Sequence, residues 1–182
     1  DLTYQSRNLG YSAAYTSIDP EFWTDSGFVP RVDLRQASAE LSYRWWPESA
    51  LMTWGPSVTY LRLFDHAGVL QDEQVQGATS FQFRSNVSFT GTYSRNLERY
   101  RSIDFRKTGY GFFGVISGRT VAIFGGFNGG DGILFSDNPY LGRSTAVNAN
   151  ASLRLTSRWA TRITAISSRF VNPIGNAEVF NV

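Results

Sequence analysis

The single histidine of the chain is the first residue whose type could support chemistry. His66 follows Asp65 directly in the segment LFDHAG, and a serine hydrolase needs a histidine base, an orienting carboxylate and a nucleophile. Adjacent residues in an extended segment point apart, and the sequence has no G-x-S-x-G nucleophile motif. The sequence therefore favours a solvated loop histidine over a catalytic dyad. With one His and no Cys, a zinc site is not expected either.

A cluster of acidic and aromatic residues is the second candidate site. Asp19, Glu21 and Asp25 surround Phe22 and Trp23, and paired carboxylates beside an exposed tryptophan can bind or cleave sugars. The alternative is structural: Asp next to Pro forms a turn, and the aromatic side chains anchor the loop. The sequence favours the turn and keeps these residues as loop ligand candidates.

The glycine-rich segment GGFNGGDGI, residues 125–133, is the third candidate site. It occurs once and lacks the Lys-Ser/Thr pair of a phosphate loop and the repetition of calcium-binding solenoids. We interpret it as the tip of a loop, in which Asp131 and Asp137 are weak calcium candidates. No cofactor is expected.

Composition excludes some classes of protein. Aromatic residues make up 15% of the chain at a mean hydropathy of −0.24, and no apolar run approaches the roughly 20 residues of a membrane-spanning helix. The net charge is +2, with Lys107 as the one lysine, and the arginines are scattered rather than gathered into a nucleic-acid-binding patch. The opening DLTYQSRNLGYS has no basic start followed by an apolar run, so no signal peptide is expected in it.

Alternation of residue types predicts strands through most of the sequence. In VSFTGTYSR, residues 87–95, apolar and hydroxyl side chains take turns, as in a strand with two different faces. Residues 36–45, 74–85 and 147–155 alternate in the same way. These strands are roughly 9 to 12 residues long, which suits a tilted membrane-crossing strand.

The predicted connections alternate in length. Tight turns are expected near 46–49, 85–86, 117–119 and 156–158, and longer polar or glycine-rich connections are expected at 17–31, 64–74, 96–104, 125–143 and 169–178. Short turns at one end and long loops at the other are typical of bacterial outer-membrane barrels. About nine strands are expected, with the start of a tenth at 178–182.

The two faces of these strands are expected to meet different surroundings. Trp and Tyr near the tight turns are typical of an interfacial aromatic girdle. The residues predicted to line a polar lumen are Gln36, Glu40, Arg44, Gln82, Arg84, Asn148, Asn150 and Arg154. The residues predicted to face lipid or form the girdle are Tyr43, Trp45, Phe81, Phe83, Phe89, Tyr93 and Leu153.

Several segments carry a resemblance to a known family. They are Asp19-Pro20 with Phe22, the run GFVPR at 27–31, the alternating strand ending at Trp46, and the segments SRNLERYRSIDF and EVFNV. Here the chain resembles the barrel region of a family of bacterial outer-membrane proteins. In that family a family-9-like carbohydrate-binding module precedes a C-terminal barrel of unassigned function. The resemblance implies that this chain is part of the barrel, and it supplies no catalytic or binding residues.

Together these patterns predict an all-β protein: an antiparallel, up-and-down transmembrane β-barrel, present in part, with no domain boundary within residues 1–182. The expected location is the outer membrane of a Gram-negative-type bacterium. Lipid, lipopolysaccharide and other envelope subunits are the expected partners. The expected function is to anchor or accompany an envelope complex or to pass solutes, without enzymatic activity. The alternatives are a soluble carbohydrate-binding β-sandwich and a barrel-embedded hydrolase.

Overall fold

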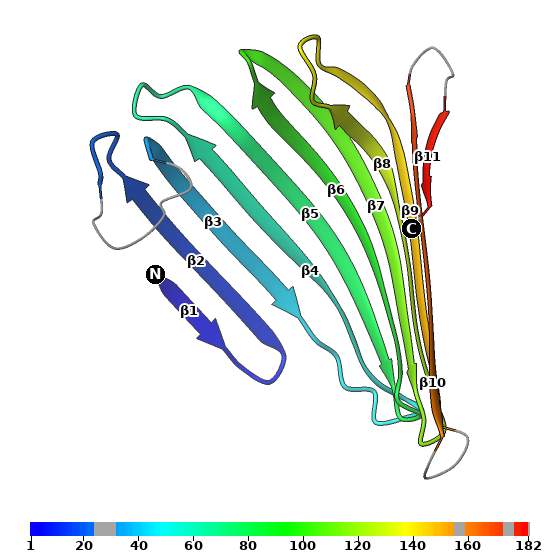
Figure 1. Ribbon diagram of the computed structural model, residues 1–182. Coiled ribbons are helices and arrows are strands. Elements are labelled where there is room, and N and C mark those ends of the chain that lie inside the picture. The colour runs from blue at the N-terminus through cyan, green and yellow to red at the C-terminus, as the bar shows by residue number, and fades with distance from the viewer. Residues whose placement is uncertain (24–31, 155–158, 173–176, 182) are drawn as a thin grey trace.

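The computed structural model describes residues 1–23, 32–154, 159–172 and 177–181, and these form one antiparallel sheet (Figure 1). Its strands are β1 Leu2–Gln5, β2 Leu9–Ile18, β3 Leu34–Tyr43, β4 Leu51–Phe64, β5 Leu70–Phe83, β6 Val87–Tyr100, β7 Ile103–Ser117, β8 Val121–Leu134, β9 Tyr140–Arg154, β10 Ala160–Val171 and β11 Ala177–Asn181. Each strand pairs with its neighbours in sequence, in the order β1 to β11. The predicted all-β, up-and-down antiparallel architecture is confirmed.

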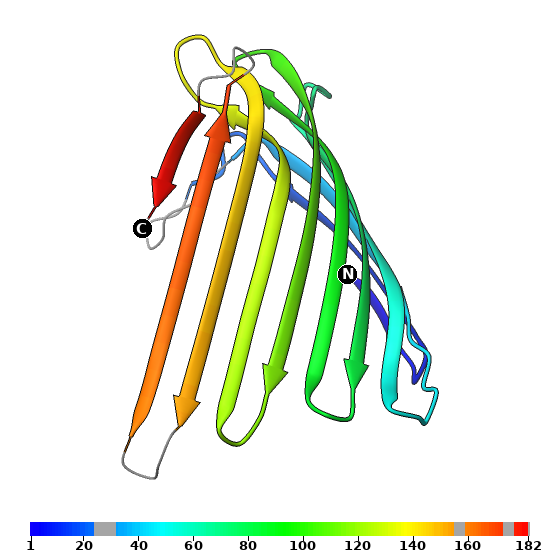
Figure 2. The ribbon, with the colours of Figure 1, turned by 90° about the vertical axis from the view of Figure 1, so that its right-hand side faces the viewer.

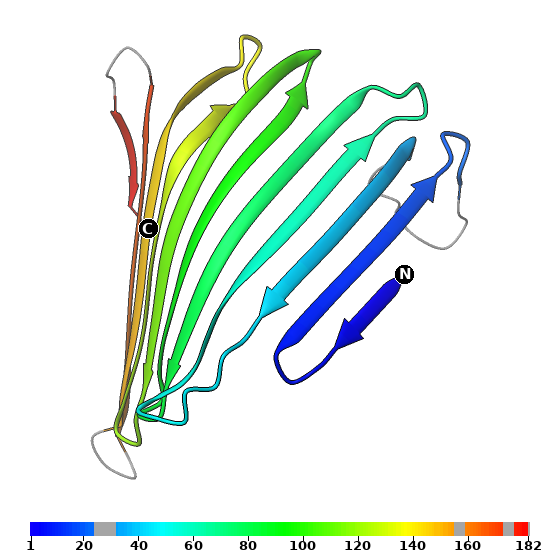
Figure 3. The same cartoon turned by 180° about the vertical axis from the view of Figure 1, so that it is seen from behind.

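The sheet is open, since β1 and β11 lie at its two edges and do not pair with each other. It is curved across the strand order: in Figure 1 the strands β1–β7 are seen face-on, whereas β8–β11 are seen nearly edge-on. Figures 2 and 3 show the same single layer from the side and from behind. In the described part of the chain, no helix has the length and apolar character needed to cross a membrane.

The number of strands and the loop lengths differ from the prediction. A turn at residues 6–8 separates β1 from β2, so the expected first strand is two strands. Ser6 makes this turn, because its N–H donates to the carbonyl of Leu9 at 2.8 Å. The tight turns expected near 85–86 and 117–119 are present, whereas the one expected near 46–49 is a longer connection, residues 44–50. The turn expected at 156–158 lies outside the described residues.

Most of the predictions of long loops at the opposite end of the strands are wrong, because the connections observed there are shorter than predicted. The connections there that lie wholly within the described residues are 65–69, 101–102 and 135–139. They are short because the strands continue through the polar segments. Arg101 and Ser102 form a two-residue hairpin with φ of 49° and 65°, a conformation normally signalled by Asn or Gly. We call the end with turns 6–8, 44–50, 84–86 and 118–120 the turn end and the other end the loop end.

The glycine-rich segment 125–133 is strand rather than loop tip, which corrects the interpretation above. It lies within β8, paired with β9 along its length. Aromatic rings of β7 occupy the space left by its missing side chains: a Cβ on Gly126 would lie 2.8 Å from the Phe113 ring, and one on Gly129 would lie 2.7 Å from the Tyr110 ring. Cross-strand aromatic packing therefore stabilises a strand of low intrinsic propensity.

The two faces of the sheet differ in composition. The apolar face carries Val87, Phe89, Gly91 and Tyr93 of β6, and the polar face carries the alternating Ser and Thr residues. Crowding varies from position to position on either face. A Cβ added to Gly77 or Gly91 on the apolar face meets nothing within 4 Å, whereas one on Gly129 of the same face would lie 2.7 Å from the Tyr110 ring. Gly77 and Gly91 are therefore open positions of the apolar face.

The described residues lack the interior of a water-soluble globular protein. The buried apolar side chains are Leu34, Leu63 and Phe105, and no large side chain is fully buried. The accessible surface is 12799 Å² for 20.4 kDa, against about 8,800 Å² for a folded monomer of that mass. The sheet is thus a single layer whose apolar face has no protein covering among the described residues.

Candidate functional site

The first candidate site is a continuous uncharged band on the apolar face. At the loop end this face carries charged residues, namely Arg35, Arg62, Glu73, Arg95, Arg99, Asp104, Arg106, Asp131, Arg143 and Arg169. From there to the turn end, the described residues of β1–β10 place no charged side chain on this face. We call this region the apolar band. Its large side chains are exposed, with Tyr93 53% and Ile163 56% accessible.

Aromatic rings stack along the turn end of this band. The ring of Trp45 lies between those of Tyr43 and Trp54, at centroid distances of 4.6 and 4.4 Å, and Trp54 stacks on Phe81 at 6.0 Å. Trp159, the residue directly before β10, is 70% exposed. These rings form one stacked cluster at the turn end, and its role as an interfacial aromatic girdle stays a prediction.

The sequence separates the two faces in the same way as the structure. Gln36, Glu40, Gln82, Asn148 and Asn150 lie on the polar face, and Arg44, Arg84 and Arg154 follow the same alternation at the strand ends. Tyr43, Trp45, Phe81, Phe83, Phe89, Tyr93 and Leu153 lie on the apolar face. Whether these faces meet a lumen and lipid stays a prediction.

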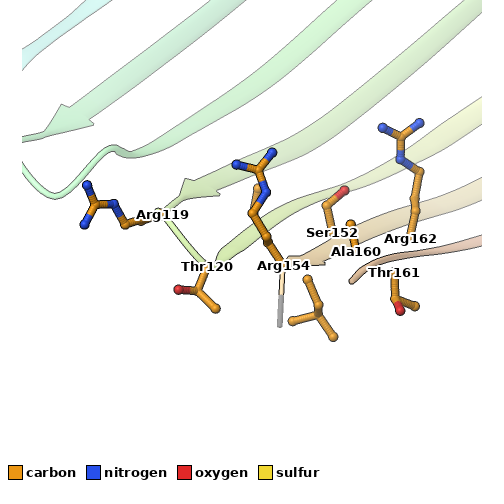
Figure 4. Close-up of a pocket in the computed structure, with 10 residues that line it drawn as sticks. Arg119, Thr120, Ser152, Arg154, Ala160, Thr161 and Arg162 are labelled. Atoms are coloured by element: carbon orange, nitrogen blue, oxygen red, sulfur yellow. The ribbon is translucent and has the colours of Figure 1, made fainter. Parts of the chain in front are cut away.

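The second candidate site is a group of arginines at the turn end of the polar face. Arg119, Arg154 and Arg162 line a hollow of about 520 Å³ between the β7–β8 turn and the ends of β9 and β10. Figure 4 shows the guanidinium groups of Arg154 and Arg162 on one side of the sheet, with Thr120 and Thr161 pointing to the other, and Arg119 extending sideways from the turn. No acidic side chain among the described residues pairs with any of the three.

Arginines mark the other turns as well. Arg7 and Arg44 both lie over the Trp46 ring, at 5.7 and 5.8 Å, and Arg84 donates to the Glu48 carbonyl at 3.2 Å. Glu48 is the one acidic residue in the turn-end connections 6–8, 44–50, 84–86 and 118–120. This end of the sheet therefore carries net positive charge, which attracts anions.

The third candidate site joins three residues from different parts of the chain at the loop end. Ser17 lies near the end of β2, Asp33 directly precedes β3, and His66 lies in the β4–β5 connection. Ser17 Oγ is 3.3 Å from His66 Nε2, and Asp33 Oδ1 is 2.9 Å from His66 Nδ1. The serine, histidine and aspartate thus form a chain of hydrogen bonds in the order of a catalytic triad.

Local geometry holds Asp33 in this position. Its φ of 57° is left-handed, and its Oδ1 also accepts a hydrogen bond from the His66 backbone N–H at 2.9 Å. The backbone and side-chain hydrogen bonds from His66 hold the pKa of Asp33 below its ordinary value. The carboxylate is therefore ionised at neutral pH and can orient the imidazole.

The sequence did not predict this constellation, although it identified His66. Asp65 points elsewhere, as expected for an adjacent residue: its carboxylate accepts from Val69 N–H at 2.7 Å and from Gln71 Nε2 at 2.9 Å. The partners of His66 lie 33 and 49 positions away. The only available signal was topological, since consecutive loop-end connections of an up-and-down sheet are neighbours.

The remaining candidates have structural partners in the described residues. Asp19 accepts a hydrogen bond from Glu21 N–H at 2.9 Å, and its carbonyl accepts one from Phe22 N–H at 3.1 Å, as the turn interpretation predicts. Trp23 is 77% exposed, and Asp25 lies outside the described residues.

The calcium candidates are not brought together into a site. Asp131 accepts from the backbone N–H and the hydroxyl of Thr108 at 2.8 and 2.7 Å, and Asp137 pairs with Arg101 at 3.3 Å. Across the described ranges, no group of three His, Cys, Asp or Glu residues is arranged to hold a metal ion.

Comparisons with known protein families, with curated proteins and with solved structures each found no match to the chain.

Proposed function

We propose that this chain is part of an integral outer-membrane β-barrel protein, with lipid against its apolar band and a water-filled or side-chain-filled interior against its polar face. The apolar band is the observation that carries the proposal. An exposed apolar surface extending over ten strands is far larger than a soluble monomer normally leaves in water. Lipid acyl chains can cover such a surface without a second protein layer.

The alternative of a soluble carbohydrate-binding sandwich needs a second sheet over the apolar face. The described residues form a single sheet with every strand in one order, so nothing in them supplies that layer. The resemblance to the barrel region of an outer-membrane family agrees with the proposal. Lipopolysaccharide and envelope subunits are the proposed partners.

The test is fractionation of the full-length protein, followed by gel electrophoresis of unheated and boiled membrane extracts. We expect recovery in the outer-membrane detergent extract and faster migration before boiling, because a closed barrel resists unfolding by detergent. Recovery as a soluble monomer without detergent would refute the proposal.

A second function is supported by the arginines of the turn end. If the assembled barrel has an open lumen, Arg119, Arg154 and Arg162 face the solute path. We propose that such a lumen conducts anions in preference to cations. Replacing these three by Gln shifts the reversal potential in a KCl gradient toward cation selectivity. A matched control replaces Arg95, Arg106 and Arg143, which carry the same total charge on the apolar face, and leaves the potential unchanged. Equal shifts in both variants would exclude a role for the turn-end arginines.

A further inference from the structure

We propose that Ser17, His66 and Asp33 form the catalytic site of a serine esterase at the loop end of the sheet, acting on carboxylic esters with an apolar acyl chain. The constellation lies outside the features that define the proposed barrel, and the activity does not depend on an open lumen. The choice of an apolar acyl chain rests on the proposed function, because it assumes that the apolar band lies in lipid.

The hydrogen-bond directions suit the reaction. With the ring proton on Nδ1 of His66 donated to Asp33 Oδ1, Nε2 is left as an acceptor for the Ser17 hydroxyl. Both groups are accessible: Ser17 is exposed, and the His66 side chain is 30% exposed. The separation of 3.3 Å between Oγ and Nε2 is within reach of proton transfer once substrate is bound.

The chemical steps follow from these positions. Ser17 Oγ attacks the ester carbonyl carbon as His66 Nε2 takes the hydroxyl proton. The bond from the carbonyl carbon to the alcohol oxygen then breaks, and the alcohol leaves with the proton from His66. Water attacks the acyl-serine with His66 as base, which releases the carboxylic acid and restores the serine hydroxyl. The balance is ester and water to acid and alcohol, with no other reactant.

Arg35 is placed to stabilise the developing negative charge. It is the direct cross-strand partner of Ser17 in the β2–β3 register, so their Cβ atoms lie about 5 Å apart. Its Nη2 donates to the Asp65 carbonyl at 3.0 Å, while its Nε is buried with no hydrogen-bond partner. A cation on the residue paired with Ser17 can stabilise the oxyanion of the tetrahedral intermediate.

The surroundings of Ser17 favour an apolar acyl chain. Ser17 lies on the apolar face, at the loop-end margin of the band, and the next residues on that face are Tyr15 and Ala37. Tyr15 is 63% exposed. An acyl chain can therefore extend along the band from Ser17 past Tyr15, with Arg35 at the level of the ester. Arg62 lies beside Ala37, one row further toward the band. A lipid-type ester fits this arrangement better than a short, water-soluble one.

The test uses the full-length protein in a non-ionic detergent. A fluorophosphonate probe and peptide mass spectrometry report modification of Ser17, and p-nitrophenyl palmitate and butyrate report hydrolysis. We expect labelling at Ser17, preference for palmitate, and loss of at least about 100-fold in kcat for Ser17→Ala and for His66→Ala. Ser12→Ala, on the same strand but the polar face, is the control and retains full activity.

Asp33 is a positioning residue, and its variant has its own readout. Asp33→Asn lowers kcat with little change in KM and moves the pH dependence of kcat/KM, because the imidazole loses its carboxylate partner. A merely structural role for Asp33 would leave the pH dependence in place. Heat-modifiable gel mobility shows that each variant is folded.

Four outcomes test the esterase, its substrate class and the barrel. Absence of label at Ser17 in a heat-modifiable protein, or hydrolysis unaffected by Ser17→Ala, overturns the esterase. Preference for butyrate overturns the apolar substrate class. Hydrolysis through Ser17 by a protein that is soluble without detergent supports the catalytic site and overturns the barrel, so the two proposals fail separately.

Discussion

Substitutions at Gly91 can report whether lipid or water surrounds the apolar band, because a new side chain there meets no protein atom. Gly91 lies on β6, four residues from both Val87 and Arg95, which is about 13 Å along the strand in each direction. A Cβ at this position meets no atom within 4 Å. A substitution therefore changes the side chain that is exposed to lipid or water, and it leaves the packing of the neighbouring side chains unchanged.

The expected free energies differ sharply between the two media. In lipid, Gly91→Lys costs about 2 to 4 kcal/mol of unfolding free energy near the bilayer midplane, whereas Gly91→Leu gains up to about 2 kcal/mol from the buried side chain. The two variants should then differ by about 2 to 6 kcal/mol. In water the same exposed position tolerates either residue to within about 0.5 kcal/mol.

The assay is equilibrium urea unfolding of the full-length protein in phospholipid vesicles, followed by tryptophan fluorescence and by unheated gel mobility. Thr90→Lys is the control, because it adds the same charge on the polar face one residue away and should cost less than about 1 kcal/mol. Equal stability of the Gly91→Lys and Gly91→Leu variants would show that the band contacts water and would refute the lipid assignment.

Three further predictions concern packing and charge. Gly126→Leu lowers the unfolding free energy by about 1 to 3 kcal/mol in the same assay, because its Cβ would lie 2.5 Å from Asn148 Oδ1. Gly125→Leu is the control and is tolerated, because its Cβ meets nothing closer than 4.0 Å. Equal costs for the two variants would contradict the crowding of the polar face at Gly126. Lys107→Met leaves the half-buried Glu98 without its ion pair and costs about 1 to 3 kcal/mol, and a double-mutant cycle with Glu98→Gln should recover part of the loss. Because the folded pKa of Asp33 lies below 3.8, its contribution to stability is complete above that pH and is lost as pH falls through the folded value. The melting temperatures of wild type and Asp33→Asn should therefore differ at pH 7 and converge in acid.

Alternation of residue types was enough to predict the strands at 36–45, 74–85, 87–95 and 147–155 and their two faces. The stretch 87–95 lies within β6 with Phe89 and Tyr93 on one face and the hydroxyl residues on the other. Side-chain direction in a strand has a fixed period of two, so the pattern specifies the faces once the strand is assumed.

Connections were predicted less well, because polarity and glycine content do not distinguish a loop from a strand whose polar side chains are solvated. The β6–β7 hairpin turns at Arg101 and Ser102, which carry no turn signal, and the β8 glycines are strand because rings on β7 pack against them. The Ser17–His66–Asp33 site could not be predicted from spacing, because sheet pairing alone brings its members together.

The consecutive pairing of β1 to β11 also determines how the sheet responds to force. Each strand is held only by the strands adjacent to it in sequence, and the edge strand β1 pairs with β2 alone. A load applied at the amino terminus and directed away from the sheet therefore acts on the β1–β2 ladder first. The hydrogen bonds of that ladder break one after another before those of β2–β3 are loaded. Pulled in this geometry, the molecule should come apart strand by strand at low force in a series of steps, and the order of the steps should follow the sequence.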